Sequence, residues 1–169
     1  MSELREVINM DVIIRLAYNE KEEISKLFDE YIDSILAEGE EVAACLNAQH
    51  YGAEMNLIEE KYGLPEGRLY IAFVDNNSVG CVALKKFDEE HAEIKRLYVR
   101  PGNRGKHIGK KLMEQVIFDA KEIGYKHIRL DTFPFMSKAI NMYKSYGFYE
   151  IERYNDNPAS TAVFMQLDL

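Results

Sequence analysis

The sequence predicts an α/β (α+β) protein with a mixed sheet flanked by helices, in a single domain over residues 1–169 with its core at about 12–169. Short β-branched and aromatic runs alternate with amphipathic stretches of helical period. Two strand-like runs are separated by a short turn, as in a hairpin, so the sheet is not all parallel. The 169 residues are 47 % hydrophobic, with no repeat or Gly/Ser linker, which suits one globular unit.

Composition excludes several classes of protein. Two cysteines, Cys45 and Cys81, are too few for a disulfide framework or a four-ligand zinc site. No apolar run approaches the roughly 18 residues of a membrane span, and the N-terminus has no apolar signal core. We therefore expect a cytoplasmic protein that needs no metal and contacts no membrane.

Charge is distributed unevenly along the chain. The net charge of −8 argues against a nucleic-acid partner. Residues 1–67 hold 16 acidic and 5 basic side chains, whereas residues 92–111 hold seven basic side chains and one acidic one. The basic segment is either a solvated face or the site of an anionic ligand.

The first elements are a strand and two helical segments. Residues 12–16 are mostly β-branched and predict a strand. Asn19 is the expected N-cap of a helix. Residues 42–62 also predict helix, ended by Gly63 and Pro65. The first helix has these apolar positions at helical spacing: Ile24, Leu27, Phe28, Tyr31, Ile32 and Ile35.

A strand-rich part follows. Residues 69–74 and 79–84 predict a hairpin around a turn at residues 75–77. Residues 92–99 predict a third strand, and the Pro-Gly-Asn at 101–103 stops it.

The last part alternates helices and strands. Residues 105–123 carry an apolar stripe at helical period, closed by Gly124. Residues 127–131 predict a strand, and residues 137–146 a short helix capped by Ser137. Final strands are expected at residues 148–154 and 162–167.

The segment from the third strand to the following helix carries the chemistry. It reads RPGNRGKHIG, a glycine-containing loop between a strand and a helix. Unpaired N–H groups of a first helical turn and the helix dipole favour phosphate. Two common phosphate loops do not fit: a P-loop would need glycine at Arg104 and Ser or Thr at Lys111, and the G-x-G-x-x-G of a Rossmann loop is absent.

Two segments together resemble the GNAT superfamily of N-acetyltransferases. Residues 93–101 followed by Arg104-Gly105-Lys106-His107-Ile108-Gly109 are similar to its acetyl-CoA motif, [RQ]-x-x-G-x-[GA]. Residues 139–148 are similar to its later A-x-x-x-Y-x-x-x-G-F segment. The resemblance implies a mostly antiparallel sheet splayed around acetyl-CoA, between the strands at 92–99 and 127–132. It implies cofactor contacts from Leu97, Tyr98, Val99, Arg104, Gly105, Lys106, His107, Ile108, Gly109 and Lys110.

Two positions depart from that pattern. His107 replaces the motif's first glycine. Because a residue at a helix start has negative φ, we expect glycine not to be required there. Met136 stands where many members have asparagine, which puts that residue's cofactor contact in doubt.

The resemblance implies direct attack of an amine on the thioester, so the cysteines are expected to be structural. His50, His91 and His127 have no metal-type partners three or four residues away and are also expected to be structural. Tyr143, at the family's tyrosine position, is the candidate general acid; its alternative role is a core aromatic. Glu93 is the candidate base, on the same strand face as Lys95 and Leu97; its alternative is a rim carboxylate paired with a lysine.

The expected function is therefore transfer of an acetyl group from acetyl-CoA to a primary amine of a small molecule or peptide. Residues 19–65 and 133–136 are expected to border the acceptor pocket, and the acidic excess favours a cationic amine. A homodimer is one option for assembly. The alternatives are a non-catalytic acyl-CoA sensor with the same fold, and a nucleic-acid adaptor, which the net charge disfavours.

Overall fold

The computed structural model describes residues 11–48 and 51–169. Its elements, in chain order, are β1 (Val12–Leu16), α1 (Lys21–Leu36), α2 (Glu40–Ala48), α3 (Tyr51–Glu54), η1 (Met55–Leu57), α4 (Ile58–Tyr62), β2 (Arg68–Val74), β3 (Asn77–Lys86), β4 (His91–Val99), η2 (Pro101–Asn103), α5 (Ile108–Ile123), β5 (His127–Thr132), α6 (Ser137–Ser145), β6 (Tyr149–Ile151) and β7 (Val163–Asp168). No helix in this part of the chain is long and apolar enough to cross a bilayer.

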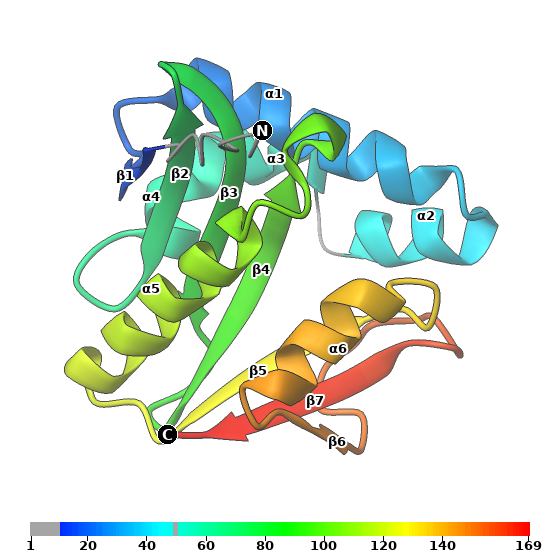
Figure 1. The fold of residues 1–169 in the computed structure, drawn as a ribbon. Helices are drawn as coiled ribbons and strands as arrows, with labels where there is room; N and C mark the ends of the chain where they lie inside the picture. The colour runs from blue at the N-terminus through cyan, green and yellow to red at the C-terminus, as the bar shows by residue number, and fades with distance from the viewer. Residues whose placement is uncertain (1–10, 49–50) are drawn as a thin grey trace, which may run out of the picture.

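One seven-stranded sheet, in the order β1-β2-β3-β4-β5-β7-β6, organises the molecule. Every neighbouring pair is antiparallel except β4 and β5. These two strands pair in parallel over three residues, ending at Glu93 and Arg129. Beyond that point they diverge, so the sheet opens like a V (Figure 1). The predicted mixed and splayed sheet is confirmed.

A bulge in β4 decides which side chains face which side of the sheet. Arg96 has a φ of 56°, and the β3–β4 register shifts between Cys81 and Ala83. One extra residue on a bulged strand reverses the alternation beyond it. Leu97 therefore packs in the same apolar cluster as Ile94.

Helices cover both faces of the sheet. The first face packs under α5 and α6, with Leu112, Met113 and Val116 fully buried (Figure 1). The second face packs against α1 and α4 through Leu27 and Phe28 among others. This burial of apolar surface is the main source of the fold's stability.

Several predicted boundaries are wrong. Helix α1 has Glu20 as its N-cap, not Asn19, and α6 has Met136 rather than Ser137. Helix α5 begins at Ile108 rather than at residue 105. The helical segment at 42–62 is broken into short pieces. Glu54, at the end of α3, is buried, and its carboxylate accepts hydrogen bonds from Tyr62 and Arg96.

Candidate active site

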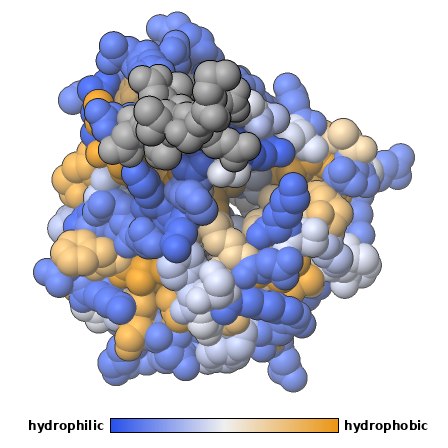
Figure 2. All heavy atoms as spheres, viewed as in Figure 1, coloured by the Kyte–Doolittle hydropathy of each residue, from blue (hydrophilic) through white to orange (hydrophobic). Residues whose placement is uncertain are grey.

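A groove of about 750 Å³ runs between β4, the start of α5, α6 and α1. It is lined by every residue predicted to bind the cofactor except Lys106, whose ammonium instead lies 3.5 Å from the Asn103 side-chain oxygen. In the view of Figure 2 the surface is hollowed near its centre, with both hydrophobic and hydrophilic side chains around the hollow. The structure therefore brings the predicted residues together around one open space.

Most of the basic side chains in residues 92–111 do not line this groove. The Arg100 guanidinium binds both carboxylate oxygens of Glu30 and the Ser78 carbonyl. Lys95 and Arg96 point to the second face of the sheet, where carboxylates neutralise them. Arg104 and Lys110 are the two cationic side chains of the segment that line the groove.

The groove also has walls that the sequence did not assign to the cofactor. Side chains from α6 and the preceding loop line one side, and Tyr31, Ser34, Ile35 and Glu38 of α1 line another. The amphipathic spacing of the two helices indicates that each buries one face, but not that the two faces meet across a groove. The residues of the α1 wall, with Phe135 and Met136, were expected at the acceptor pocket and line the groove instead. The other residues from α6 are Ser137, Lys138, Ala139, Met142 and Ser145.

A second cavity, of about 290 Å³, lies on the other face of the splayed sheet. Its walls come from β3, β4, β5, the short helices α3 and α4, and the loop between β6 and β7. They carry Glu54, Lys61, Tyr62, Lys85, Phe87, Glu93, Lys95, Arg96, Asp131, Asn155, Asp156 and Asn157.

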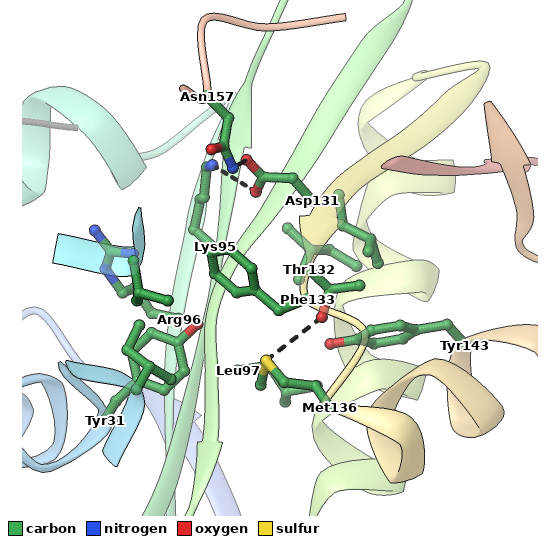
Figure 3. A pocket seen from close by; sticks show the side chains of 14 residues that line it. Tyr31, Lys95, Arg96, Leu97, Asp131, Thr132, Phe133, Met136, Tyr143 and Asn157 are labelled. Carbon is green, nitrogen blue, oxygen red and sulfur yellow. Dashed lines mark hydrogen bonds and ion pairs between the residues drawn. The ribbon is translucent and has the colours of Figure 1, made fainter. Parts of the chain in front are cut away.

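The groove and the cavity meet at a narrow junction of about 40 Å³. Leu97, Met136 and Tyr143 line both the junction and the groove, whereas Lys95 and Asp131 line both the junction and the cavity. Figure 3 shows the two groups on different sides, with Lys95 directed toward Asp131 and Tyr143 directed into the space beside Leu97 and Thr132. A reaction between two bound molecules, one from each side, fits such a passage.

The surroundings of Tyr143 are compatible with both roles that the sequence left open. The side chain is 6 % exposed and packs against the Phe148 ring, with centroids 5.7 Å apart. Its hydroxyl points into the junction (Figure 3). Burial raises the pKa of this phenol well above its ordinary value, so it keeps its proton at all working pH values.

Glu93 is buried, and its surroundings correct the prediction about its face. The carboxylate accepts a hydrogen bond from Tyr154 at 2.5 Å and lies 3.4 Å from the Lys95 ammonium. It shares a face with Lys95, as predicted, but not with Leu97, because the bulge at Arg96 lies between them. Glu93 therefore lines the cavity and not the groove.

The family model for the acetyltransferase (GNAT) family matches residues 25–148, which include β4, α5, β5 and α6. The chain belongs to the GNAT family. As a GNAT enzyme it is an N-acetyltransferase with acetyl-CoA as its donor. The predicted family, enzyme class and donor are confirmed. An uncharacterised N-acetyltransferase of Schizosaccharomyces pombe is 36 % identical over 126 residues, which cover 73 % of this chain and 77 % of the relative.

Solved structures have the same fold. An acetyltransferase from Streptococcus agalactiae superposes with a TM-score of 0.77 at 22 % identity, covering 94 % of this chain and 98 % of that one; this likeness supports the fold alone. A GNAT acetyltransferase from Elizabethkingia anophelis, solved with acetyl-CoA bound, gives a TM-score of 0.55 at 26 % identity, covering 68 % and 82 % of the two chains.

The structure corrects the prediction for His107, the first departure from the GNAT motif. This residue precedes α5 with a φ of 60° and ψ of 17°, in the left-handed region. The expected negative φ was wrong, because the chain turns through His107 before the helix begins. Glycine is favoured at such a position, since a Cβ atom there costs roughly 1–2 kcal/mol.

We expect His107→Gly to raise the free energy of unfolding by about 1 kcal/mol, because it removes this conformational cost. CoA affinity should stay within about tenfold, roughly 1.4 kcal/mol, if the backbone N–H is what the ligand needs. Denaturant titration and calorimetry with CoA measure the two quantities. A larger loss of affinity would show that the imidazole itself holds the ligand.

Met136, the second departure, lies at the junction. Its sulfur accepts a hydrogen bond from the Thr132 hydroxyl at 3.4 Å (Figure 3). This contact ties the start of α6 to the end of β5, the two elements that form one wall of the junction.

The remaining candidate nucleophiles and ligands have structural surroundings. Cys81 is fully buried, and burial raises the pKa of its thiol far above the ordinary value. The His91 and His127 rings stack 4.8 Å apart, and their Nδ1 atoms contact Asp88 and Asp168 respectively. Across residues 11–48 and 51–169 no group of three or more His, Cys, Asp and Glu side chains is arranged to hold a metal. His50 and the Cys45 side chain lie outside the described part.

Proposed function

We propose that this enzyme transfers the acetyl group of acetyl-CoA to a primary amine by direct attack, with both substrates bound at once. The observation that carries the proposal is the junction, which joins the groove to the polar cavity on the second face of the sheet. A groove of about 750 Å³ falls within the usual size of cofactor sites. The acetyl-CoA bound to the Elizabethkingia relative supports acetyl-CoA as the donor.

The loop before α5 is our proposed pyrophosphate site. Backbone N–H groups at the start of α5 lack intrahelical partners, and the helix dipole adds positive potential there. Arg104 and Lys110 supply side-chain charge beside the loop. These features suit an anion of two linked phosphates.

The edge of β4 is our proposed binding strand for the pantetheine arm. Its pairing with β5 ends at Glu93, so the backbone at Leu97 and Val99 faces the opening of the V. A ligand with amide groups can pair with such an edge as an added strand does. The Val99 carbonyl accepts a hydrogen bond from Arg104, and its second lone pair leaves room for a ligand donor.

Two residues are our candidates for moving protons. Bound acetyl-CoA supplies the thioester whose C–S bond breaks as the amine nitrogen bonds to the carbonyl carbon. Tyr143 would donate its hydroxyl proton toward the sulfur as charge develops there, and the second proton that the nitrogen loses as the amide forms would restore the phenol. Glu93 would take the proton that the acceptor ammonium must lose, from the cavity side of the sheet.

An acceptor screen that detects released thiol tests the proposal. The screen covers polyamines, amino acids, aminoglycosides and peptide N-termini, with purified protein and acetyl-CoA. We expect one class to release thiol at a rate far above the hydrolysis background. CoA binding without turnover on any amine would instead identify a non-catalytic acyl-CoA sensor.

We expect Glu93→Gln to lower kcat about tenfold or more near pH 6.5 and by less than about twofold near pH 9.5, because at high pH the amine has already lost its proton. Glutamine is nearly isosteric and can still accept the hydrogen bond from Tyr154. A pH–rate profile measures the effect, with Glu89→Gln, an exposed acid on the turn before β4, as the control. Parallel profiles would leave Glu93 with a structural role.

A further inference from the structure

The proposed acceptor cavity separates its charges into an inner and an outer zone. The inner zone consists of the buried groups Glu54, Glu93, Lys95, Arg96 and Asp131. The outer zone consists of the more exposed Lys61, Lys85 and Asp156. Since the cavity walls hold both zones, a ligand that fills it contacts both.

Three of the inner zone's buried groups are carboxylates and two are cations, and the partly exposed Lys85 of the outer zone lies 3.9 Å from one carboxylate, Glu93. Arg96 pairs with Glu54, Nε to Oε2 at 3.0 Å. Lys95 divides its single charge between Glu93, at 3.4 Å, and Asp131, at 3.2 Å. Buried charge without a counter-charge is costly, so this zone favours a ligand that brings one positive charge.

Neutral donors reduce the imbalance without removing it. The Asp131 carboxylate accepts hydrogen bonds from Asn157 at 2.9 Å and Asn155 at 3.1 Å, and Glu93 accepts one from Tyr154. These bonds favour the ionised form of Asp131, whose pKa is lowered chiefly by Lys95 against the opposing effect of burial. Asp131 lines both the cavity and the junction, which places its charge close to where the amine must react.

Two of the three charged side chains that line the outer zone are cations. They are Lys61 of α4 and Lys85 of β3, and the third is the exposed acid Asp156. The Lys85 ammonium lies 3.9 Å from Glu93, with its side chain 37 % exposed. Burial lowers the pKa of Lys61, and the neighbouring cations Arg96, Lys85 and Lys95 lower it further against the pull of Glu54. An anionic group is favoured here.

We infer, resting on the proposed function, that the acceptor is a small zwitterion, an amino acid or a similarly short amino carboxylate. Its ammonium lies at Glu93 and Asp131, and its carboxylate lies between Lys61 and Lys85. The cavity of about 290 Å³ has room for roughly ten water molecules, which suits a molecule of this size. A linear polyamine would place its second ammonium against the two lysines, where like charges repel.

Matched acceptors test this inference directly. Each amino acid is assayed for thiol release beside its carboxamide and its decarboxylated amine, and kcat/KM is expressed per unprotonated amine because the three amines differ in pKa. We expect at least one amino acid to exceed both analogues by tenfold or more. Any polyamine should give a lower value than the best amino acid.

Lysine variants locate the carboxylate. Lys61→Gln and Lys85→Gln should each raise the KM of the amino acid about tenfold and leave the KM of its carboxamide nearly unchanged. Lys86→Gln is the matched control, because Lys86 is the next residue in sequence but pairs with Glu66 and Glu89 outside the cavity. It should change neither KM.

Three results would overturn the inference. Preference for a polyamine or a decarboxylated amine would do so while leaving the proposed transferase function intact. Equal effects of Lys61→Gln and Lys85→Gln on the amino acid and its carboxamide would show that these lysines do not contact a carboxylate. Intact CoA binding without turnover on any amine would refute the proposed function, and the inference with it.

Discussion

Replacing Gly109 with glutamate is expected to weaken CoA binding at least a hundredfold, about 2.7 kcal/mol. Gly109 lies in the first turn of α5 and lines the groove. A Cβ atom there would approach Val99 at 3.7 Å and Met142 at 4.0 Å, which are ordinary contacts. The backbone therefore accepts a side chain, and the carboxylate enters the space proposed for the pyrophosphate, where it blocks and repels the ligand.

Calorimetry with CoA measures this effect, with two further variants for comparison. Gly102→Glu adds the same charge in η2, at a position where a Cβ atom meets nothing within 4 Å and which does not line the groove. It should bind CoA nearly as the wild type does. Gly109→Ala should lose less affinity than Gly109→Glu. Unchanged affinity in a folded Gly109→Glu protein would refute the placement of the pyrophosphate.

The sequence predicted the strands and long helices well where the hydrophobic period is strong. The stripe of α5 and the paired runs of β2 and β3 are examples, because apolar burial on one face imposes the period. The turn between β2 and β3 was also predictable: Asp75 and Asn76 adopt positive φ, as residues of their type tolerate in hairpin turns. Local signals of this kind do not depend on the rest of the fold.

Tertiary contacts explain what the sequence did not predict. The bulge at Arg96 has no local signal, because arginine seldom adopts positive φ, and the buried pair with Glu54 accompanies it there. The pairing of Arg100 with Glu30 joins residues far apart in sequence. In both contacts a carboxylate neutralises an arginine of residues 92–111, the segment whose composition indicated an anion site. The number of basic residues in this segment therefore overestimated the positive charge that faces the groove.

The groove and the cavity were predictable to different degrees. The groove follows from one contiguous motif, so nine of its residues could be named in advance. The cavity is lined by one or a few residues from each of several elements, including Asn155 and Asn157 on the loop between β6 and β7. Nothing in the spacing of these residues indicates that they meet at Asp131.

The Tyr143 hydroxyl is expected to account for about a hundredfold of kcat. Its position at the junction lets it donate to a sulfur held in the groove, and charge develops on that sulfur mainly in the transition state. Tyr143→Phe keeps the ring that packs on Phe148. We therefore expect the loss in kcat, roughly 2.7 kcal/mol, with little change in Tm or CoA affinity.

The matched control is Tyr146→Phe, one turn further along the chain. The Tyr146 hydroxyl lies 3.2 Å from Glu114 and 3.3 Å from the Lys110 carbonyl, outside the junction. This variant should keep kcat. Burial raises the pKa of the Tyr143 hydroxyl far above its ordinary value. The pH–rate profiles of the wild type and Tyr143→Phe should therefore have the same shape and differ by a constant factor. Equal kcat values for the two proteins would reduce Tyr143 to a core aromatic.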